Sequence, residues 1–372
     1  MQMIDNAMRL LADDLTGALD TAAAFVRLSG PISVYWPDVI PTELPQSAAL
    51  DTATRELGRA EATAVLDRLS PTLASGALAF KKIDTLLRGH PAAELAACFR
   101  QGTWRFCVLA PAFPYQGRTT RGGRQYISKP DGGWSLAGGD LAAELAAEGL
   151  AVQLARPGCD IAPGITLFDA EIDQDLACIV AAGQRADGAV LWCGSSGLAR
   201  ALAGGVDAPR SDGLQPPVLG LFGSDHPVTN RQLAACGARW AQLEERDIRS
   251  GSAIRDRLDH DGLVLASIEL PPGLTRSEAQ QRIGRKMATI VDQVMPPRTL
   301  LVTGGETLRS LCLSLEAESL EVYGEIEPGL PRSRMRGGRW DGVDVVSKSG
   351  HFGGDQLWRD LVDRNGLALE RA

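Results

Sequence analysis

The sequence predicts an α/β protein of two domains, each a mostly parallel sheet flanked by helices. Short apolar runs alternate with Ala-rich helical segments along both halves of the chain, as in parallel α/β sheets. The 372 residues exceed what one ordinary hydrophobic core organises. A stretch rich in Gly and Pro at residues 204–217 interrupts the alternation. We therefore expect an N-terminal domain over residues 1–205, a linker over 206–217 and a C-terminal domain over 218–372.

In the first half, apolar runs predict strands over residues 9–12, 32–36, 48–51, 77–82 and 106–110. The segments between them predict helices over residues 16–28, 55–69 and 91–99, with Pro91 and Glu94 favourably placed in the first turn of the last. Residues 114–139 are rich in Gly, Arg and Thr with little periodicity, which predicts a long ordered loop over a site. Strands over 150–154, 165–169 and 189–193 and a helix over 175–185 follow.

In the second half the same alternation begins again. It predicts strands over residues 218–222, 263–270 and 299–303 and helices over 229–236, 277–294 and 306–315. A last apolar strand precedes the Gly-rich segment that begins at Lys348.

Composition excludes several classes of protein. The net charge of −8 argues against generic binding to nucleic acid or to an anionic membrane. No run of 18 apolar residues occurs, and two acids interrupt the only apolar stretch near the N-terminus, so neither a membrane span nor a signal peptide is expected. The seven cysteines include no CxxC pair, which predicts buried thiols in a reducing cytoplasm and no structural zinc site.

The first candidate site is the turn after the first strand. Asp13 and Asp14 stand where the strand ends, and Thr16 and Gly17 open the following helix. Ligands of open α/β sheets bind outside the carboxyl ends of strands, which is where this turn falls. Asp14 could accept hydrogen bonds from substrate hydroxyls or act as a general base, with Asp13 supporting it. The alternative is that Asp14 or Thr16 only caps the helix.

The second candidate site is the polar segment after the strand at residues 77–82. Lys82, Asp84 and Arg88 follow one another within seven residues. The planar fork of Arg88 matches a carboxylate bidentately, so the segment could hold the acid group and hydroxyls of a sugar acid. The alternative is a solvated turn between strand and helix.

Three Gly-rich segments of the second half are candidates for binding phosphate. A Gly-Ser turn with Ser224 precedes the helix that opens this half, and a Gly-Gly turn precedes the helix near residue 306. Neither a Walker A loop nor GxGxxG after the first strand is present. The alternative for each Gly pair is a tight turn, and the alternative for Lys348, which begins the third segment, is a solvated side chain. The nucleotide-binding candidates are Ser224, Gly304, Gly305, Glu306, Thr307, Lys348, Gly350 and Gly353.

Carboxylates in one half and Gly-rich turns with a lysine in the other suggest phosphoryl transfer between two substrates held on separate halves. Six blocks then occur in a fixed order between residue 10 and about residue 354: ADDLTGALD, KKIDTLLRG, APAFPYQGRTT, GGET, PGLP and KSGHFG. These blocks and their order resemble those of the four-carbon acid sugar kinase family, also called DUF1537. It departs from the common pattern at His226, where relatives carry a second Ser, and it is shorter than many of them.

The resemblance implies a sugar-acid-binding N-terminal domain, a nucleotide-binding C-terminal domain and an active site in the cleft between them. It implies an ATP-dependent kinase that phosphorylates a terminal hydroxyl of threonate, erythronate or a 3-oxo-tetronate. Mg²⁺ would bridge the ATP phosphates, with water and few protein groups as its other ligands. Arg88 and Lys82 would hold the substrate carboxylate, and Asp14 would orient or deprotonate the attacking hydroxyl. A homodimer fits this reading. A non-catalytic sugar-acid sensor and a sugar-acid dehydrogenase or aldolase are the alternatives.

Overall fold

The structure is a computed structural model that describes residues 7–129, 131–205, 209–223, 226–247 and 249–367. The chain divides into two compact units, Met1–Ala208 and Pro209–Ala372. The division falls inside the expected linker at residues 206–217. The boundaries proposed from the sequence at 205 and 218 stay a prediction.

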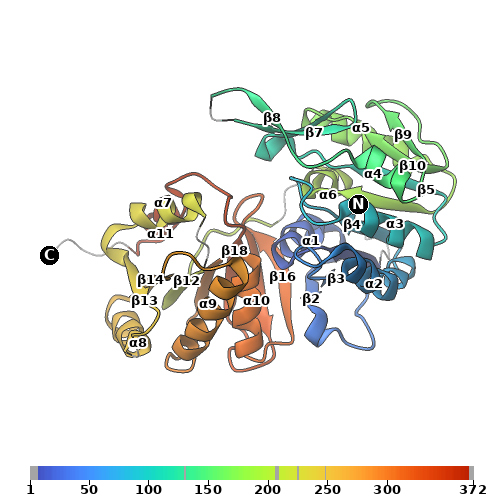
Figure 1. Ribbon diagram of the computed structural model, residues 1–372. Helices are drawn as coiled ribbons and strands as arrows, with labels where there is room; N and C mark the ends of the chain where they lie inside the picture. The colour runs from blue at the N-terminus through green and yellow to red at the C-terminus, as the bar shows by residue number, and fades with distance from the viewer. Residues whose placement is uncertain (1–6, 130, 206–208, 224–225, 248, 368–372) are drawn as a thin grey trace. The chain divides into compact units, whose positions relative to one another are not determined.

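The N-terminal unit is built on a parallel sheet (Figure 1). The order of its strands is β2-β3-β1-β4-β11-β5-β10-β9. Their bounds are β1 Met8–Ala12, β2 Ile32–Tyr35, β3 Ala48–Asp51, β4 Leu78–Lys82, β5 Phe106–Ala110, β9 Val152–Ala155, β10 Gly164–Phe168 and β11 Val190–Gly194. These are the strands that the apolar runs predicted, each within about two residues.

Helices cover both faces of this sheet. They are α1 Leu15–Ser29, α2 Arg59–Leu69, α3 Pro91–Gln101, α4 Leu141–Ala147, α5 Asp173–Gln184 and α6 Ser196–Leu202, with 3₁₀ turns η1 Pro37–Val39 and η2 Ser70–Ser75. Two consecutive residues of β4 point to opposite faces of the sheet. Phe80 packs edge-on against Phe25 of α1, with 5.7 Å between the ring centroids, whereas Ala79 belongs to the core with Leu66 of α2 and Leu95 of α3.

Residues 114–139 form a small antiparallel sheet, so the prediction of a long loop is wrong. After the 3₁₀ turn η3 Pro114–Gln116, strands β6 Arg118–Arg121, β7 Arg124–Ser128 and β8 Trp134–Leu136 pair in chain order. Gly122 and Gly123 join β6 to β7, both with positive φ (57° and 74°), as a tight hairpin turn requires. Their N–H groups donate to the Asp169 carboxylate at 2.8 Å each. The Gly-Gly pair was a recognisable turn signal, but the strands are too polar to show the period-two apolar pattern that predicts a strand.

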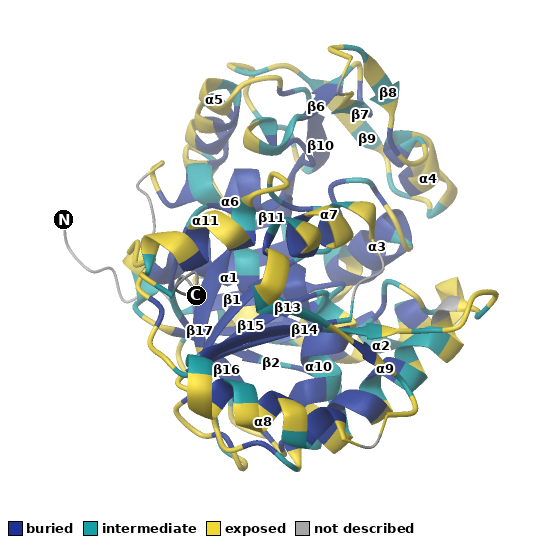
Figure 2. Cartoon of the chain, turned by 90° about the vertical axis from the view of Figure 1, so that its left-hand side faces the viewer, coloured by how far each residue is buried: buried dark blue, intermediate teal, exposed yellow. Residues whose placement is uncertain are grey.

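The C-terminal unit has a mixed sheet in the order β13-β14-β12-β15-β18-β17-β16, with β17 antiparallel to both neighbours. The strands are β12 Val218–Phe222, β13 Trp240–Glu244, β14 Leu263–Glu269, β15 Thr299–Thr303, β16 Ser319–Glu325, β17 Pro331–Arg336 and β18 Asp344–Lys348. The helices are α7 Pro227–Ala235, α8 Ser250–Asp261, α9 Arg276–Val291, α10 Gly305–Ser314 and α11 Leu357–Arg364, with a 3₁₀ turn η4 Gly237–Arg239. Figure 2 shows the inner strands as buried.

Several elements have no counterpart in the sequence analysis. They are α4, α6, β13, α8, β16, β17 and α11. Strands β16 and β17 lack a continuous apolar run because polar or charged residues alternate along them, and Arg336 of β17 forms an ion pair with Glu321 of β16. The helix expected over residues 55–69 begins only at Arg59, which leaves Arg55 in the preceding loop.

Each unit has a point at which the strand order reverses. From β1 the chain adds β2 and β3 on one side and then β4 on the other. From β12 it adds β13 and β14 on one side and then β15 on the other. Crevices outside the carboxyl ends of strands at such points are where open α/β sheets bind ligands. The first and second candidate sites of the sequence analysis both fall at the point beside β1, and the Gly-rich turns after β12 and β15 fall at the point beside β12.

No described helix is long and apolar enough to cross a bilayer.

Among the cysteines, burial raises the pKa of the Cys98 and Cys236 thiols, to about 12 and about 11. Cys159 is exposed and Cys178 is half-buried, so the expectation that every thiol is buried is wrong for these two.

The buried ion pair between Lys81 and Glu94 supports the core between β4 and α3. Nζ lies 2.7 Å from Oε2, and the two side chains are 0% and 2% exposed. Glu94→Gln should lower the free energy of unfolding in urea by about 3–5 kcal/mol, because it leaves the ammonium buried without its counter-charge. Replacing both partners by apolar residues (Lys81→Met with Glu94→Leu) should recover most of that loss.

The matched control for this pair is Asp160→Asn, since Asp160 and Arg185 form an ion pair with 89% and 59% of their side chains exposed. That change should alter the free energy of unfolding by less than about 0.5 kcal/mol. Equal effects of Glu94→Gln and Asp160→Asn would contradict a structural role for the buried pair.

Candidate active site

The turn after β1 places two carboxylates at the reversal point of the N-terminal sheet. Asp14 has extended backbone angles and caps α1, accepting from the Gly17 amide at 2.9 Å and from Thr16 Oγ1 at 2.6 Å. The capping contact proposed as the alternative is therefore present. A Cβ at Gly17 would lie 2.6 Å from Asp14 Oδ1 and 3.3 Å from Lys82 Nζ, so a larger residue there would displace the Asp14 carboxylate.

Arg55 joins the carboxylates of this turn to one another. It follows β3 in a loop in which Thr52 donates from its amide to the Ala12 carbonyl at 2.8 Å. Its guanidinium binds Asp13 bidentately, with Nε–Oδ2 and Nη2–Oδ1 both 2.8 Å. It also lies 2.7 Å from Asp14 Oδ2 and 3.5 Å from Asp84 Oδ1. The sequence analysis missed Arg55 by placing it in a helix; its position four residues after a buried strand was the available signal.

The segment after β4 brings the remaining predicted residues to the same edge. Asp84 accepts from the amides of Leu86 and Arg88 at 3.1 and 3.2 Å, which fixes the turn. Arg88 also binds Asp84 with its fork, Nε–Oδ2 at 2.9 Å and Nη2–Oδ1 at 2.8 Å. Lys82 is 5% exposed, and its Nζ donates to the Ile83 carbonyl at 2.8 Å.

The charges of this cluster stabilise one another. Burial alone would raise the pKa of Asp14, but the charges of Arg55 and Lys82 and the Thr16 hydrogen bond outweigh burial and lower it. The pKa of Asp84 is likewise lowered: burial raises it, and the Arg88 bond and the Arg55 charge more than compensate. Both carboxylates are therefore ionised at neutral pH and can accept hydrogen bonds from hydroxyl groups. All the predicted catalytic and substrate-binding residues meet here: Asp13, Asp14, Thr16, Lys82, Asp84 and Arg88.

In the C-terminal unit, the turns after β12 and β15 lie side by side. Gly304 has a positive φ of 98° and precedes α10. A Cβ at Gly223 would lie 2.3 Å from Thr307 Oγ1, so the backbone of the first turn approaches α10 closely. Helix α7 begins after the first turn, so two helix N-termini face this edge. Glu306 is exposed in the first turn of α10, and Ser224 lies outside the described residues.

The segment after β18 completes this edge. The Gly304 amide donates to the Lys348 carbonyl at 2.9 Å. Thr229 of α7 donates to the Gly350 carbonyl at 2.9 Å, which holds the Gly-rich segment against α7. Gly353 has a positive φ of 86°. Except for Ser224, the predicted nucleotide-binding residues therefore lie on the turns and helix starts of this one edge.

Lys348 is the most unusual side chain of this unit. It is 1% exposed, and its Nζ donates to the Ser349 carbonyl at 3.0 Å. In the described part of the chain, no carboxylate lies within ion-pair distance of it. Burial lowers the pKa of this lysine to about 7, because the charged form is poorly solvated.

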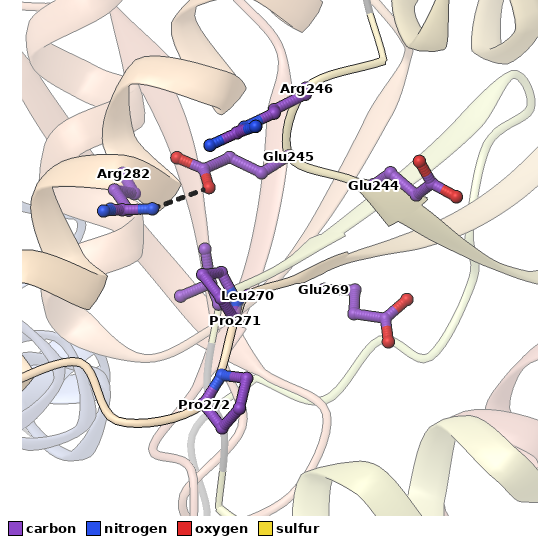
Figure 3. A pocket seen from close by; sticks show the side chains of 8 residues that line it. All are labelled: Glu244, Glu245, Arg246, Glu269, Leu270, Pro271, Pro272 and Arg282. Atoms are coloured by element: carbon purple, nitrogen blue, oxygen red, sulfur yellow. Dashed lines mark hydrogen bonds and ion pairs between the residues drawn. The ribbon is translucent and has the colours of Figure 1, made fainter.

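A hollow of about 420 Å³ opens at the carboxyl ends of β13 and β14 (Figure 3). Glu244 and Glu269 are register partners on these strands and so lie side by side. Arg282 of α9 donates to Glu245 at 3.1 Å. The lining is Glu244, Glu245, Arg246, Glu269, Leu270, Pro271, Pro272 and Arg282. Because β14 pairs with β12, the hollow is next to the phosphate-binding candidates along the same edge.

Within the described ranges, no group of three His, Cys, Asp or Glu side chains could hold a metal ion by itself. His226, the departure from the family pattern, caps α7 through Nδ1, which accepts from the Val228 amide at 3.2 Å. Its ring lies 6.3 Å from that of His351, centre to centre.

Comparison with known proteins divides the chain in the same way. Residues 8–146 match the family model of a sugar-binding N-terminal domain, and residues 219–357 match that of a nucleotide-binding C-terminal domain. Two crystal structures share the fold. A protein of Salmonella typhimurium LT2 has a TM-score of 0.71 at 18% identity, covering 95% of this chain and 98% of its own. A DUF1537 protein of Haemophilus influenzae has a TM-score of 0.67 at 17% identity, covering 96% and 100%.

Curated relatives match over nearly their whole length. The D-threonate kinase of Cupriavidus necator is 32% identical, covering 94% of this chain and 96% of the relative. The D-threonate kinase of Bordetella bronchiseptica is 30% identical, covering 92% and 94%. The D-erythronate kinase of Heliobacterium modesticaldum is 23% identical, covering 95% and 96%. The chain therefore belongs to the four-carbon acid sugar kinase family, and it is a kinase rather than a dehydrogenase, an aldolase or a sensor.

Proposed function

We propose that this kinase transfers the γ-phosphoryl group of ATP to a terminal hydroxyl of a four-carbon sugar acid, with D-threonate as the first candidate. Three of the curated relatives are named D-threonate kinase and a fourth D-erythronate kinase. The two acids differ in the configuration of one hydroxyl, so they present the same functional groups to a site.

The observation that carries the proposal is the buried Lys348 at the reversal point of the C-terminal sheet. A buried ammonium without a counter-ion is unfavourable, and a phosphate group would supply the missing charge. Two helix N-termini and the close-packed Gly223 and Gly304 turns surround the same edge, and such termini offer backbone N–H groups to phosphate. These groups fit a nucleotide. We propose that Gly304, Gly305, Thr307, Gly350 and Gly353, together with Ser224 and Glu306, hold it.

We further propose that the hollow at β13 and β14 takes the nucleoside. Glu269 ends the strand next to β12, and a carboxylate at such a strand end can accept from ribose hydroxyls. Leu270 and Pro271 offer apolar surface to a base. Mg²⁺, when bound with ATP, would neutralise phosphate charge and be held largely by phosphate oxygens and water.

In the N-terminal unit, Asp14 is proposed to orient the attacking hydroxyl. Its low pKa keeps it ionised, so it can accept the hydroxyl hydrogen bond while Arg55 and Asp13 hold its position. Thr16 and Asp84 stand beside it for other hydroxyls. Lys82 adds positive charge to the same edge.

The overall test is ADP release measured with ATP and a panel of four-carbon acids: we expect turnover with threonate or erythronate. Absence of ADP release with every acid would refute the proposal.

Removing Lys348 should weaken nucleotide binding in a pH-dependent way. Phosphate favours the ammonium form, so binding takes up a proton when the pH exceeds about 7. The wild-type protein should therefore bind ADP about tenfold more weakly at pH 8 than at pH 6, measured by calorimetry. Lys348→Met should bind about 10–100-fold more weakly at pH 6 and lose this tenfold step. Lys129→Met removes an exposed lysine and serves as the control. An unchanged ADP affinity in Lys348→Met would contradict the role.

Asp14→Asn separates capping from catalysis. Asparagine caps a helix about as well as aspartate, so α1 should stay intact. Loss of the carboxylate from the hydroxyl-binding position should lower kcat by about 10²–10⁴-fold while ADP affinity is retained. The matched control is Asp140→Asn, because Asp140 caps α4 by accepting from the Ala143 amide at 3.0 Å. If both variants kept normal kcat, Asp14 would be a cap alone.

Glu269→Gln tests the nucleoside site. If Glu269 accepts from ribose, the variant should bind ADP about tenfold more weakly, since hydrogen bonds to a charged group contribute about 1.5–3 kcal/mol. Wild type should discriminate against a deoxyribose nucleotide, and the variant should not. Asp256→Asn, an exposed acid of α8, is the control. Equal discrimination in wild type and Glu269→Gln would place the ribose elsewhere.

A further inference from the structure

The charged groups at the edge of the N-terminal sheet balance one another. Three carboxylates and three cations are linked there by ion pairs and by mutual electrostatic effects: Asp13, Asp14, Asp84, Arg55, Lys82 and Arg88. The fork of Arg55 is shared among the three carboxylates, and that of Arg88 is occupied by Asp84. The Nε–Nη2 edge of Arg88 is therefore already bound to a carboxylate, and the donors of Arg55 are divided among three.

Arg118 is a further cation of the N-terminal unit, and no described carboxylate forms an ion pair with it. It begins β6, directly after Gly117, and only 9% of its surface is exposed. Its Nη1 donates to the Gln116 carbonyl, while its buried Nε has no acceptor. In the ranges that the structure describes, no carboxylate lies within ion-pair distance of it. Burial lowers the pKa of Arg118, and the Asp84 charge opposes that effect while the Arg88 charge adds to it.

The small sheet that carries Arg118 rests on the turn of the cluster. Gln125 of β7 donates to the Thr85 carbonyl at 3.1 Å. A Cβ at Gly138 would lie 2.9 Å from the Leu86 carbonyl oxygen and 2.4 Å from the Leu87 Cβ. Gln125 also accepts from Thr120 of β6 at 2.8 Å, so this packing brings β6, the strand that Arg118 begins, to the turn after β4. The effect of the Asp84 and Arg88 charges on the pKa of Arg118 agrees with that position.

We propose that Arg118 receives the carboxylate of the sugar acid and makes the site select acids over neutral polyols. The inference rests on the proposed function. A substrate carboxylate would supply the missing charge and the missing acceptor together, because a planar guanidinium matches it bidentately. A neutral analogue would leave the buried guanidinium unpaired, which is unfavourable. The role of Arg88 becomes that of holding Asp84.

The test compares D-threonate with its neutral amide, D-threonamide, as substrates and as ligands in calorimetry without nucleotide. Wild type should prefer threonate in kcat/KM by about 10–100-fold. In Arg118→Met the kcat/KM for threonate should fall by that factor, while that for threonamide should change less than about threefold. Arg118→Lys should recover part of the preference, since it restores charge without the fork. Arg121→Met is the control on the same strand, because the side chain of Arg121 is 38% exposed and pairs with Glu171.

Retention of the acid preference in Arg118→Met would overturn the inference, as would its loss in Arg88→Met with Arg118 intact. Circular dichroism and thermal melting will check that each variant is folded. If Arg118→Met does not fold, the acid preference of Arg118→Lys decides the role of Arg118. If wild type bound threonate but released no ADP from ATP, the proposed function would fail, while the binding comparison would still decide the role of Arg118.

Discussion

The guanidinium of Arg55 is the constraint on which the N-terminal site depends. It comes from the loop after β3 and binds carboxylates that follow β1 and β4, so one side chain joins the ends of three neighbouring strands. Removing one member of such a buried network leaves its partners charged and unpaired, which is strongly unfavourable. The same contacts keep Asp14 ionised and in place at the first turn of α1. The ion pairs of Arg55 therefore hold the strand ends together and also keep the Asp14 carboxylate charged.

Much of the fold could be read from the sequence because parallel strands are buried on both faces. Their apolar runs stand out, as at β5 and β12, where the predicted and observed bounds agree. The candidate residues of the first site could also be found, because each follows such a strand. The kinase family followed from six blocks in order, and the comparisons confirm it.

The rest depends on contacts between segments that are distant in the chain. Arg55 and Arg118 each look like an ordinary surface residue in sequence. Only the contact of Arg55 with Asp84 and the packing of the small sheet on the turn after β4 bring them to this site. The small sheet escaped prediction because its polar strands share little of the period-two apolar pattern. The hollow at β13 could not be predicted because that strand is only partly buried and has no continuous apolar run.

The tight turn at Gly17 has a consequence for how this enzyme can change. Replacing a helical glycine by alanine ordinarily stabilises a helix by about 1 kcal/mol. Here the added methyl group would press on the Asp14 carboxylate and approach the Lys82 ammonium. A change that favours helix α1 would thus displace the group proposed to orient the hydroxyl. A more stable helix α1 and an undisturbed Asp14 carboxylate are therefore opposing requirements at this position.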